Sequence, residues 1–204
     1  MNPPRQPEKR QNILKAATEM FLADGYAGVS VDGIIARIGG SKRTIYAYFD
    51  GKDGLFAAII AQLCEEIVNP ITHMDLKRKP LHEALSTIAH TFLEVVLAPR
   101  TLALHRLVVA EAPRAPEAAR SFFDAAPATA YRCLTEYFTW ADGAGLVAPG
   151  DAQTRAVIFL DALTGDMQLR CLLGLMDSPS QTERQRLIEE AIRVFIGGLA
   201  PHDS

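Results

Sequence analysis

The fold is decided by residues 30–55, which read SVDGIIARIGGSKRTIYAYFDGKDGL. Ser30 is a favourable N-cap for a first short helix, and Ser41 is one for a second helix over residues 42–49. Two glycines separate them, and glycine is the residue that most readily ends a helix. Two short helices joined by so tight a turn indicate a helix-turn-helix arrangement.

Longer amphipathic helices are expected on either side of this unit. Residues 9–23 carry apolar side chains at three- and four-residue steps, the helical period. Gly25 is expected to stop that helix, with Tyr26 folding back on its last turn. After the unit, a helix is expected over residues 52–68, with Pro70 at its end.

Beyond Pro80 every long segment again has the helical period. These segments are 81–98, 101–112, 116–125, 128–143, 152–176 and 181–199. No strand-like alternation bounded by turn residues occurs between them, so the sequence predicts an all-α fold. We expect a helix-turn-helix domain over 1–51 with 10–55 as its core, a connecting helix and linker over 52–79, and a larger helical domain over 80–204.

Composition limits the classes of function. The chain has 204 residues, 49% of them apolar, and a net charge of −3, which excludes a disordered chain and a uniformly basic one. The charge is unevenly distributed. Up to Leu55 there are eight Lys and Arg against six Asp and Glu, and after it thirteen against eighteen. The first part of the chain, up to Leu55, is therefore mildly basic, and the remainder is acidic.

No motif indicates catalysis, a metal or a cofactor. The three cysteines are far apart without C-x-x-C spacing, and the five histidines are dispersed. H-E-x-x-H, Glu-x-x-His, G-x-S-x-G and glycine-rich phosphate loops are all missing. There is also no uninterrupted apolar run of membrane-spanning length and no secretion signal. We therefore expect a soluble cytoplasmic protein that is not an enzyme, binds no metal or cofactor and does not associate with a membrane.

The second short helix has side chains suited to DNA. Arg43 is the best candidate for reading guanine in the major groove, because its guanidinium matches that base edge. Lys42, Thr44, Tyr46 and Tyr48 suit contacts to the sugar-phosphate backbone. Lys52, at a helix start, suits a phosphate. The alternative is that the two tyrosines are half-buried packing residues and Arg43 is a solvated surface charge.

The same stretch resembles the DNA-binding motif of TetR/AcrR-type transcriptional repressors. The resemblance includes Thr44-Ile45-Tyr46, Phe49 and 52–55, and extends upstream to Ile13, Ala17, Phe21 and Gly25. It implies that DNA is contacted by Ser30, Val31, Lys42, Arg43, Thr44, Tyr46, Tyr48 and Lys52. Two positions depart from the family pattern: Ile35 stands where a small Ala is usual, and Gly33 where a polar residue is usual.

The larger domain resembles one branch of the same family in residues 106–117 and 165–170. This resemblance implies that the domain binds a ligand and dimerises. Independently, the last two predicted helices are apolar nearly all round, which requires burial on more than one side. A two-fold four-helix bundle would meet that requirement. We expect its interface at Phe159, Leu163, Met167, Ile188, Ile192 and Phe195; the alternative places both helices centrally in the core of a monomer.

Polar and aromatic residues within the larger domain are candidates for an effector pocket. They are His90, His105, Arg106, Glu111, Phe122, Phe123, Tyr137, Asp161, Asp166 and Arg170. Polar groups in apolar helices need partners when buried, and aromatic side chains commonly line ligand cavities. The alternative for most of the aromatic residues is ordinary core packing, which the sequence favours. The alternative for the polar residues is structural pairing of Arg106 with Glu111 and of Asp166 with Arg170, the second at the four-residue spacing of a helical ion pair.

Together these features favour a homodimeric repressor that binds a palindromic DNA operator and is released by a small-molecule effector. Two alternatives belong to other classes of protein. A helical enzyme lacks a recognisable site in this sequence. A ligand-binding adaptor without DNA binding leaves Lys42, Arg43, Tyr46 and Lys52 without a common role.

Overall fold

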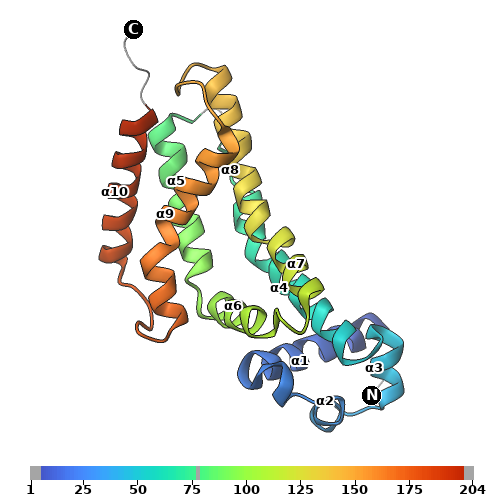
Figure 1. Cartoon of the computed structure of the whole chain (residues 1–204). Coiled ribbons are helices and arrows are strands. Elements are labelled where there is room, and N and C mark those ends of the chain that lie inside the picture. Colours follow the sequence, from blue (N-terminus) through green and yellow to red (C-terminus); the bar gives the residue numbers. More distant parts are fainter. Residues whose placement is uncertain (1–5, 77–78, 200–204) are drawn as a thin grey trace. The chain divides into compact units, whose positions relative to one another are not determined.

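The computed structural model describes residues 6–76 and 79–199, and within them every regular element is an α-helix (Figure 1). The helices are α1 Gln6–Gly28, α2 Val31–Ile38, α3 Lys42–Phe49, α4 Gly51–Thr72, α5 Leu81–Val96, α6 Pro99–Glu111, α7 Pro116–Ala125, α8 Pro127–Gly143, α9 Ala152–Leu172 and α10 Gln181–Leu199. The all-α prediction is confirmed.

The described residues form two compact units. Of these residues, unit 1 contains 6–64 and Ala103–Phe122, and unit 2 contains 65–76, 79–102 and 123–199. Unit 1 therefore includes residues from the middle of the sequence as well as the helix-turn-helix stretch. The domain bounds expected from the sequence remain a prediction.

Gly25 interrupts α1 as its sequence context predicts. Its φ of 72° and ψ of 174° are non-helical, and glycine adopts a positive φ at no steric cost. Tyr26 then folds back, with its ring centroid 5.8 Å from that of Phe21 in a stacked arrangement. The same ring meets Phe56 of α4 edge-on at 4.9 Å. The turn at Gly25 thus joins α1 to α4 inside unit 1.

α4 is longer than its sequence predicts, because Pro70 lies inside the helix rather than ending it. Proline lacks an N–H and so removes one backbone hydrogen bond, but it does so here in the last turn. Ile71 is buried in the core of unit 2, and that burial favours continuing the helix by one turn. Composition alone would allow α4 to span a membrane. Its side chains nevertheless supply the core of unit 1, where Leu55, Ile59 and Ile60 are fully buried.

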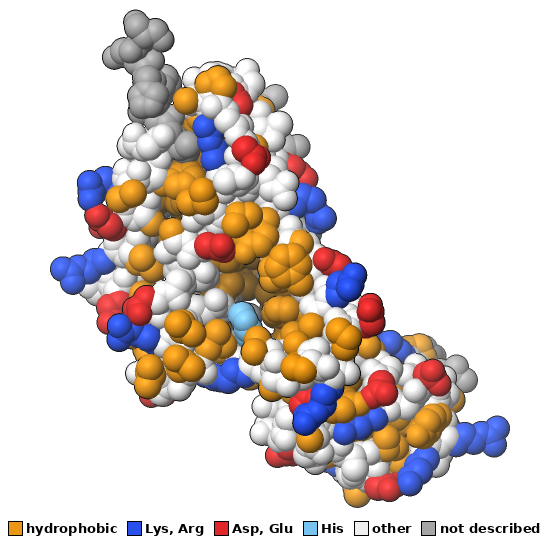
Figure 2. Space-filling view, in the orientation of Figure 1, with side chains coloured by type: hydrophobic (Ala, Val, Ile, Leu, Met, Phe, Trp, Pro, Cys, Tyr) orange, Lys and Arg blue, Asp and Glu red, His pale blue; other side chains and the backbone are white. Residues whose placement is uncertain are grey.

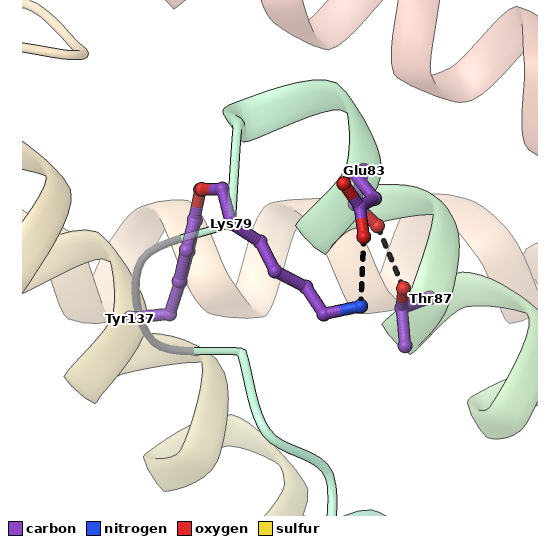
Figure 3. A network of polar contacts seen from close by, with 4 residues as sticks. All are labelled: Lys79, Glu83, Thr87 and Tyr137. Atoms are coloured by element: carbon purple, nitrogen blue, oxygen red, sulfur yellow. Dashed lines mark hydrogen bonds and ion pairs between the residues drawn. The ribbon is translucent and has the colours of Figure 1, made fainter.

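Unit 2 is a bundle in which α5, α8, α9 and α10 share one apolar core. Phe138 of α8, Phe159 of α9 and Phe195 of α10 lie together there, with centroid distances of 5.1 Å between Phe159 and Phe195 and 5.8 Å between Phe138 and Phe195. Tyr137 ties α8 to the start of α5, because its hydroxyl donates to the Lys79 carbonyl at 3.1 Å. The Lys79 ammonium in turn pairs with Glu83 at 2.9 Å (Figure 3).

α9 ends at Leu172, four residues before the end that its apolar pattern predicts. Gly174 adopts a φ of 72°, and its N–H donates to the Cys171 carbonyl. The next N–H, of Leu175, donates to Arg170, which completes a Schellman motif. The apolar residues beyond Leu172 therefore belong to a turn and not to the helix.

Candidate DNA-binding site

α2 and α3 form the two-helix unit that the sequence predicts. Ser30 caps α2, since its Oγ accepts a hydrogen bond from the Gly33 N–H at 3.0 Å. Ile34 of α2 and Ile45 of α3 are fully buried, and α2 packs against both α1 and α3. Ile35 and Ile38 of α2 are half-buried.

Ser41 occupies the N-cap position of α3 but does not cap it in the expected way. Its backbone is extended, with a φ of −141°, yet its side chain makes no bond to the helix backbone. The Oγ instead lies 3.2 Å from the Thr44 hydroxyl. A hollow of about 260 Å³ lies beside this turn, lined by Lys9, Asn12, Ile13, Ile35, Ile38, Gly39, Gly40, Ser41, Thr44 and Ile45.

The eight residues expected to contact DNA all lie in unit 1. On α3, Lys42, Arg43 and Tyr46 are exposed, and Tyr46 keeps 57% of its surface accessible. Thr44, Tyr48 and the Val31 side chain at the start of α2 are half-buried, and Ser30 is exposed. Arg43 and Tyr46 therefore occupy the solvent face of α3, opposite the buried Ile45. That placement suits a helix that enters a groove.

Two of the predicted lysines have partners within the protein. Lys42 Nζ lies 2.9 Å from Asp32 Oδ2 of α2, and this carboxylate raises the pKa of the Lys42 ammonium. Lys52 Nζ lies 3.9 Å from the centroid of the Tyr26 ring. Partial burial lowers the pKa of Lys52, and the Glu111 carboxylate acts in the opposite direction.

The sequence analysis did not indicate these partners of the two lysines. Asp32 lies in the first turn of α2, and its pairing with Lys42 of α3 depends on how the two helices pack. The Tyr26 contact to Lys52 joins residues far apart in the chain, so no local pattern could indicate it. Glu111 was assigned to an effector pocket, but it belongs to unit 1 with the DNA-binding helices.

The ten candidate effector residues are dispersed. His105, Arg106, Glu111 and Phe122 belong to unit 1, whereas His90, Phe123, Tyr137, Asp161, Asp166 and Arg170 belong to unit 2. Asp161 accepts a hydrogen bond from Tyr131 at 2.9 Å, and Asp166 pairs with Arg170 at 2.7 Å on an exposed face. The pairing of Asp166 with Arg170 agrees with the alternative that these two residues form a structural ion pair.

Two hollows in unit 2 each include one of these candidates. Tyr137 lines a hollow of about 370 Å³, together with Ile71, Thr72, His73, Met74, Asp75, Leu76, Cys133, Glu136 and Trp140. His90 lines another of about 240 Å³, with Leu93, Glu94, Gln181, Arg184, Gln185 and Ile188. The first has the volume and aromatic lining of a small-molecule site.

The residues expected at a dimer interface lie mostly inside the protomer. Phe159, Leu163, Ile188 and Ile192 are at most 2% exposed, and Met167 and Phe195 pack against the same core while half-buried. A fully buried side chain has no surface left to cover with a second copy. Among the large apolar side chains described on these two helices, Ile158, Leu169 and Val194 are the exposed ones.

Comparison with known families covers both halves of the chain. Residues 13–59 match the bacterial regulatory proteins of the tetR family. Residues 83–198, more than half of the chain, match the C-terminal domain of AefR-like transcriptional repressors. The first match contains α2 and α3, and the second contains the core helices of unit 2.

Similar proteins include the transcriptional activator FasR of Mycolicibacterium smegmatis, 33% identical over 64 residues, which are 31% of this chain and 29% of FasR. The repressor NicS of Pseudomonas putida is 35% identical over 54 residues, 26% of each chain. The alignments thus span less than a third of either of these two relatives.

Solved structures extend the similarity to the full length. The flavonoid-responsive regulator FrrA is 28% identical, with a TM-score of 0.80 over 97% of this chain and 100% of FrrA. A TetR-family regulator from Mesorhizobium loti shares the fold, at 23% identity and a TM-score of 0.84 over 98% and 100% of the two chains. The chain belongs to the TetR family, whose members are non-enzymatic DNA-binding transcriptional regulators, and has an AefR-like C-terminal domain.

Proposed function

We propose that the protein is a homodimeric, cytoplasmic repressor that binds a palindromic operator through α3 of each copy and is released by a small-molecule effector. The observation that carries the proposal is the division of α3 into two faces. Ile45 and Phe49 are buried, while Arg43 and Tyr46 face solvent. A guanidinium on the open face of such a helix suits bidentate contact with guanine.

Repression is favoured over activation by the match to AefR-like repressors and by the similarity to NicS, which is a repressor. FasR, by contrast, is an activator. A reporter gene controlled by the operator distinguishes repression from activation. Expression of the protein should lower reporter output, and a rise in output would reject repression.

Selection of bound duplexes from random DNA would identify the operator, and two variants would then test the contacts. Arg43→Ala should cost about 1–3 kcal/mol on the operator and relax base preference at one position. Lys52→Ala should weaken binding to every sequence. It should also reduce the slope of log affinity against log salt concentration by about one.

Arg37→Ala is the matched control, because Arg37 is an exposed arginine of α2 that already pairs with Glu19. It should leave operator preference unchanged. If Arg43→Ala weakened operator and random DNA equally, its role in reading bases would be rejected.

We assign the dimer contact to the exposed apolar residues of α9 and α10. Hydrophobic side chains gather over the end of α9 and the loop that follows it, where Leu169, Leu173 and Leu175 are exposed (Figure 2). Val194 of α10 is 63% exposed. Apolar side chains exposed along two adjacent helices favour a two-fold helical interface.

Val194→Glu should therefore give a folded monomer in light scattering. Val109→Glu is the control, since Val109 of α6 is a valine of similar exposure, 61%, and should leave the dimer intact. A Val194→Glu dimer of wild-type affinity would reject this interface.

The candidate effector site is the hollow lined by Tyr137 and Trp140. The likeness to FrrA, a flavonoid-responsive regulator, favours a planar aromatic effector, which these rings could stack against. Trp140 is the one tryptophan of the chain, so its fluorescence reports on this hollow. Titration with a flavonoid should change that fluorescence and release the operator. Release without a fluorescence change would place the effector elsewhere.

A further inference from the structure

Lys52 does not extend freely into solvent. It is the second residue of α4, and its side chain is half-buried. Its Nζ lies 3.9 Å from the centroid of the Tyr26 ring, within the range of a cation–π interaction. The side chain that the sequence assigns to a DNA phosphate therefore has a defined position before any DNA is present.

The Tyr26 ring is itself held from three directions. Phe21 of α1 stacks on it, and Phe56 of α4 meets it edge-on. Both phenylalanines are almost fully buried. The Tyr26 hydroxyl donates a hydrogen bond to Asp53 Oδ1, on the residue that follows Lys52. The ring is thus a fixed platform at the first turn of α4.

The contact with the Tyr26 ring leaves donor groups of the Lys52 side chain available to a ligand. A lysine ammonium has three N–H donors, and the face of one ring does not occupy them all. The first turn of a helix also has unpaired backbone N–H groups, which attract anions. An ordered ammonium beside a helix N-terminus is a favourable arrangement for one phosphate oxygen.

Glu111 adds a second influence on the same ammonium. Its side chain, at the end of α6 in unit 1, is buried, and its Oε2 has no hydrogen-bond partner within the described residues. The nearest cation to that oxygen by ion-pair distance is Arg114, at 3.6 Å. The Glu111 charge favours the protonated form of Lys52 and so acts against the lowering of its pKa by burial.

We propose that Tyr26 is a positioning residue for DNA binding: its ring holds the Lys52 ammonium at the start of α4, ready to contact a phosphate. A flexible lysine loses side-chain freedom when it binds DNA, whereas a lysine ordered by the fold has already lost it. This inference rests on the proposed function, because it requires that Lys52 contacts the operator backbone.

A double-mutant cycle tests the proposal. Tyr26→Leu removes the ring face but keeps an apolar side chain, and should weaken binding to operator and random duplexes by about two- to fivefold. In a Lys52→Met background the same change should have no further effect. Tyr26→Phe is the control, because it keeps the ring and loses only the hydrogen bond to Asp53.

Proton NMR of the free protein gives a second measurement that does not depend on DNA. The methylene protons next to Lys52 Nζ should be shifted upfield by the ring current in the wild type and in Tyr26→Phe, but not in Tyr26→Leu. Circular dichroism confirms that each variant is folded.

If Tyr26→Leu reduced DNA affinity equally in the wild-type and Lys52→Met backgrounds, the role of Tyr26 would be purely structural. That result would overturn the positioning proposal. Absence of the upfield shift in the wild type would overturn it as well. Failure of the wild type to bind any selected duplex would instead reject the proposed function.

Discussion

Lys42 at the start of α3 and Asp32 in the first turn of α2 form an ion pair between the two helices of the DNA-binding unit, with Nζ and Oδ2 2.9 Å apart. Both side chains are more than 60% exposed, so water and salt screen the pair and it adds little to stability. Its importance lies in its position. A carboxylate beside an expected phosphate-binding lysine reduces the positive charge that DNA meets.

Asp32→Asn should therefore strengthen DNA binding. The change removes one negative charge near the phosphates and leaves Lys42 without a competing partner. We expect about two- to fivefold tighter binding to operator and random duplexes alike, declining as salt rises. Fluorescence anisotropy at several salt concentrations measures this. Glu19→Gln, which removes the exposed partner of Arg37, is the control; unchanged or weaker binding by Asp32→Asn would contradict the prediction.

Gly54 is required by the close approach of α3 to α4. A Cβ at this position would lie 1.6 Å from the Phe49 carbonyl oxygen, which is backbone and cannot rotate away. Gly54→Ala should destabilise the protein by about 1–3 kcal/mol and displace α3, with loss of operator binding. Thermal unfolding and a mobility shift measure the two effects. Gly143→Ala, where no atom lies within 4 Å of the new Cβ, should retain full binding.

A capping box starts α10 and makes its stability depend on pH. The Ser180 N–H and hydroxyl donate to Glu183 Oε2 at 2.8 and 2.7 Å, and the Glu183 N–H donates to Ser180 Oγ at 3.2 Å. The Ser180 hydroxyl bond, with the backbone bond beside it, lowers the pKa of Glu183. Its contribution is therefore present above the unfolded-state pKa and disappears as pH falls through the lower folded-state value.

Ser180→Ala should cost about 1 kcal/mol at neutral pH. Thermal unfolding of the wild type and of Glu183→Gln is compared at pH 7, 4 and 3. The difference between their melting temperatures should shrink once Glu183 is protonated. Glu189→Gln in the middle of α10 serves as the control. A difference that stays constant down to pH 3 would show that the Glu183 charge is not involved.

The three cysteines should differ in reactivity. Cys64 and Cys171 are buried, and burial raises the pKa of the Cys64 thiol to about 11. Cys133 is half-buried, and burial with the nearby Glu136 raises its pKa. At pH 8 a thiol reagent should therefore modify one residue per folded chain, slowly, and three after denaturation. Cys133→Ala should abolish the native reaction, and rapid modification of two thiols would contradict this burial.

Much of the fold could be predicted from local sequence signals. The period of apolar residues predicts each helix, Gly25 interrupts α1, and Ser30 and Gly39 cap the two ends of α2. The ends that were mispredicted have physical reasons. Pro70 is tolerated because Ile71 is buried after it, and α9 stops at Leu172 because Gly174 completes a Schellman turn. The capping box of Ser180 and Glu183 has the S-x-x-E spacing, which is a local signal for the start of a helix.

The sequence by itself determined the all-α fold and the helix-turn-helix unit, because these depend on periodicity and caps. Local chemistry indicated six candidate residues for DNA on α3 and at the start of α4, and the family resemblance added Ser30 and Val31. Only the tertiary structure decided which apolar residues of the last two helices are buried in the core of the protomer. Phe159 and Ile192 are buried inside the protomer, whereas Ile158 and Val194 beside them are exposed. It also brought Tyr26 to Lys52 and Asp32 to Lys42. Apolar character and charge are local properties, but burial and partners depend on how helices distant in the sequence pack together.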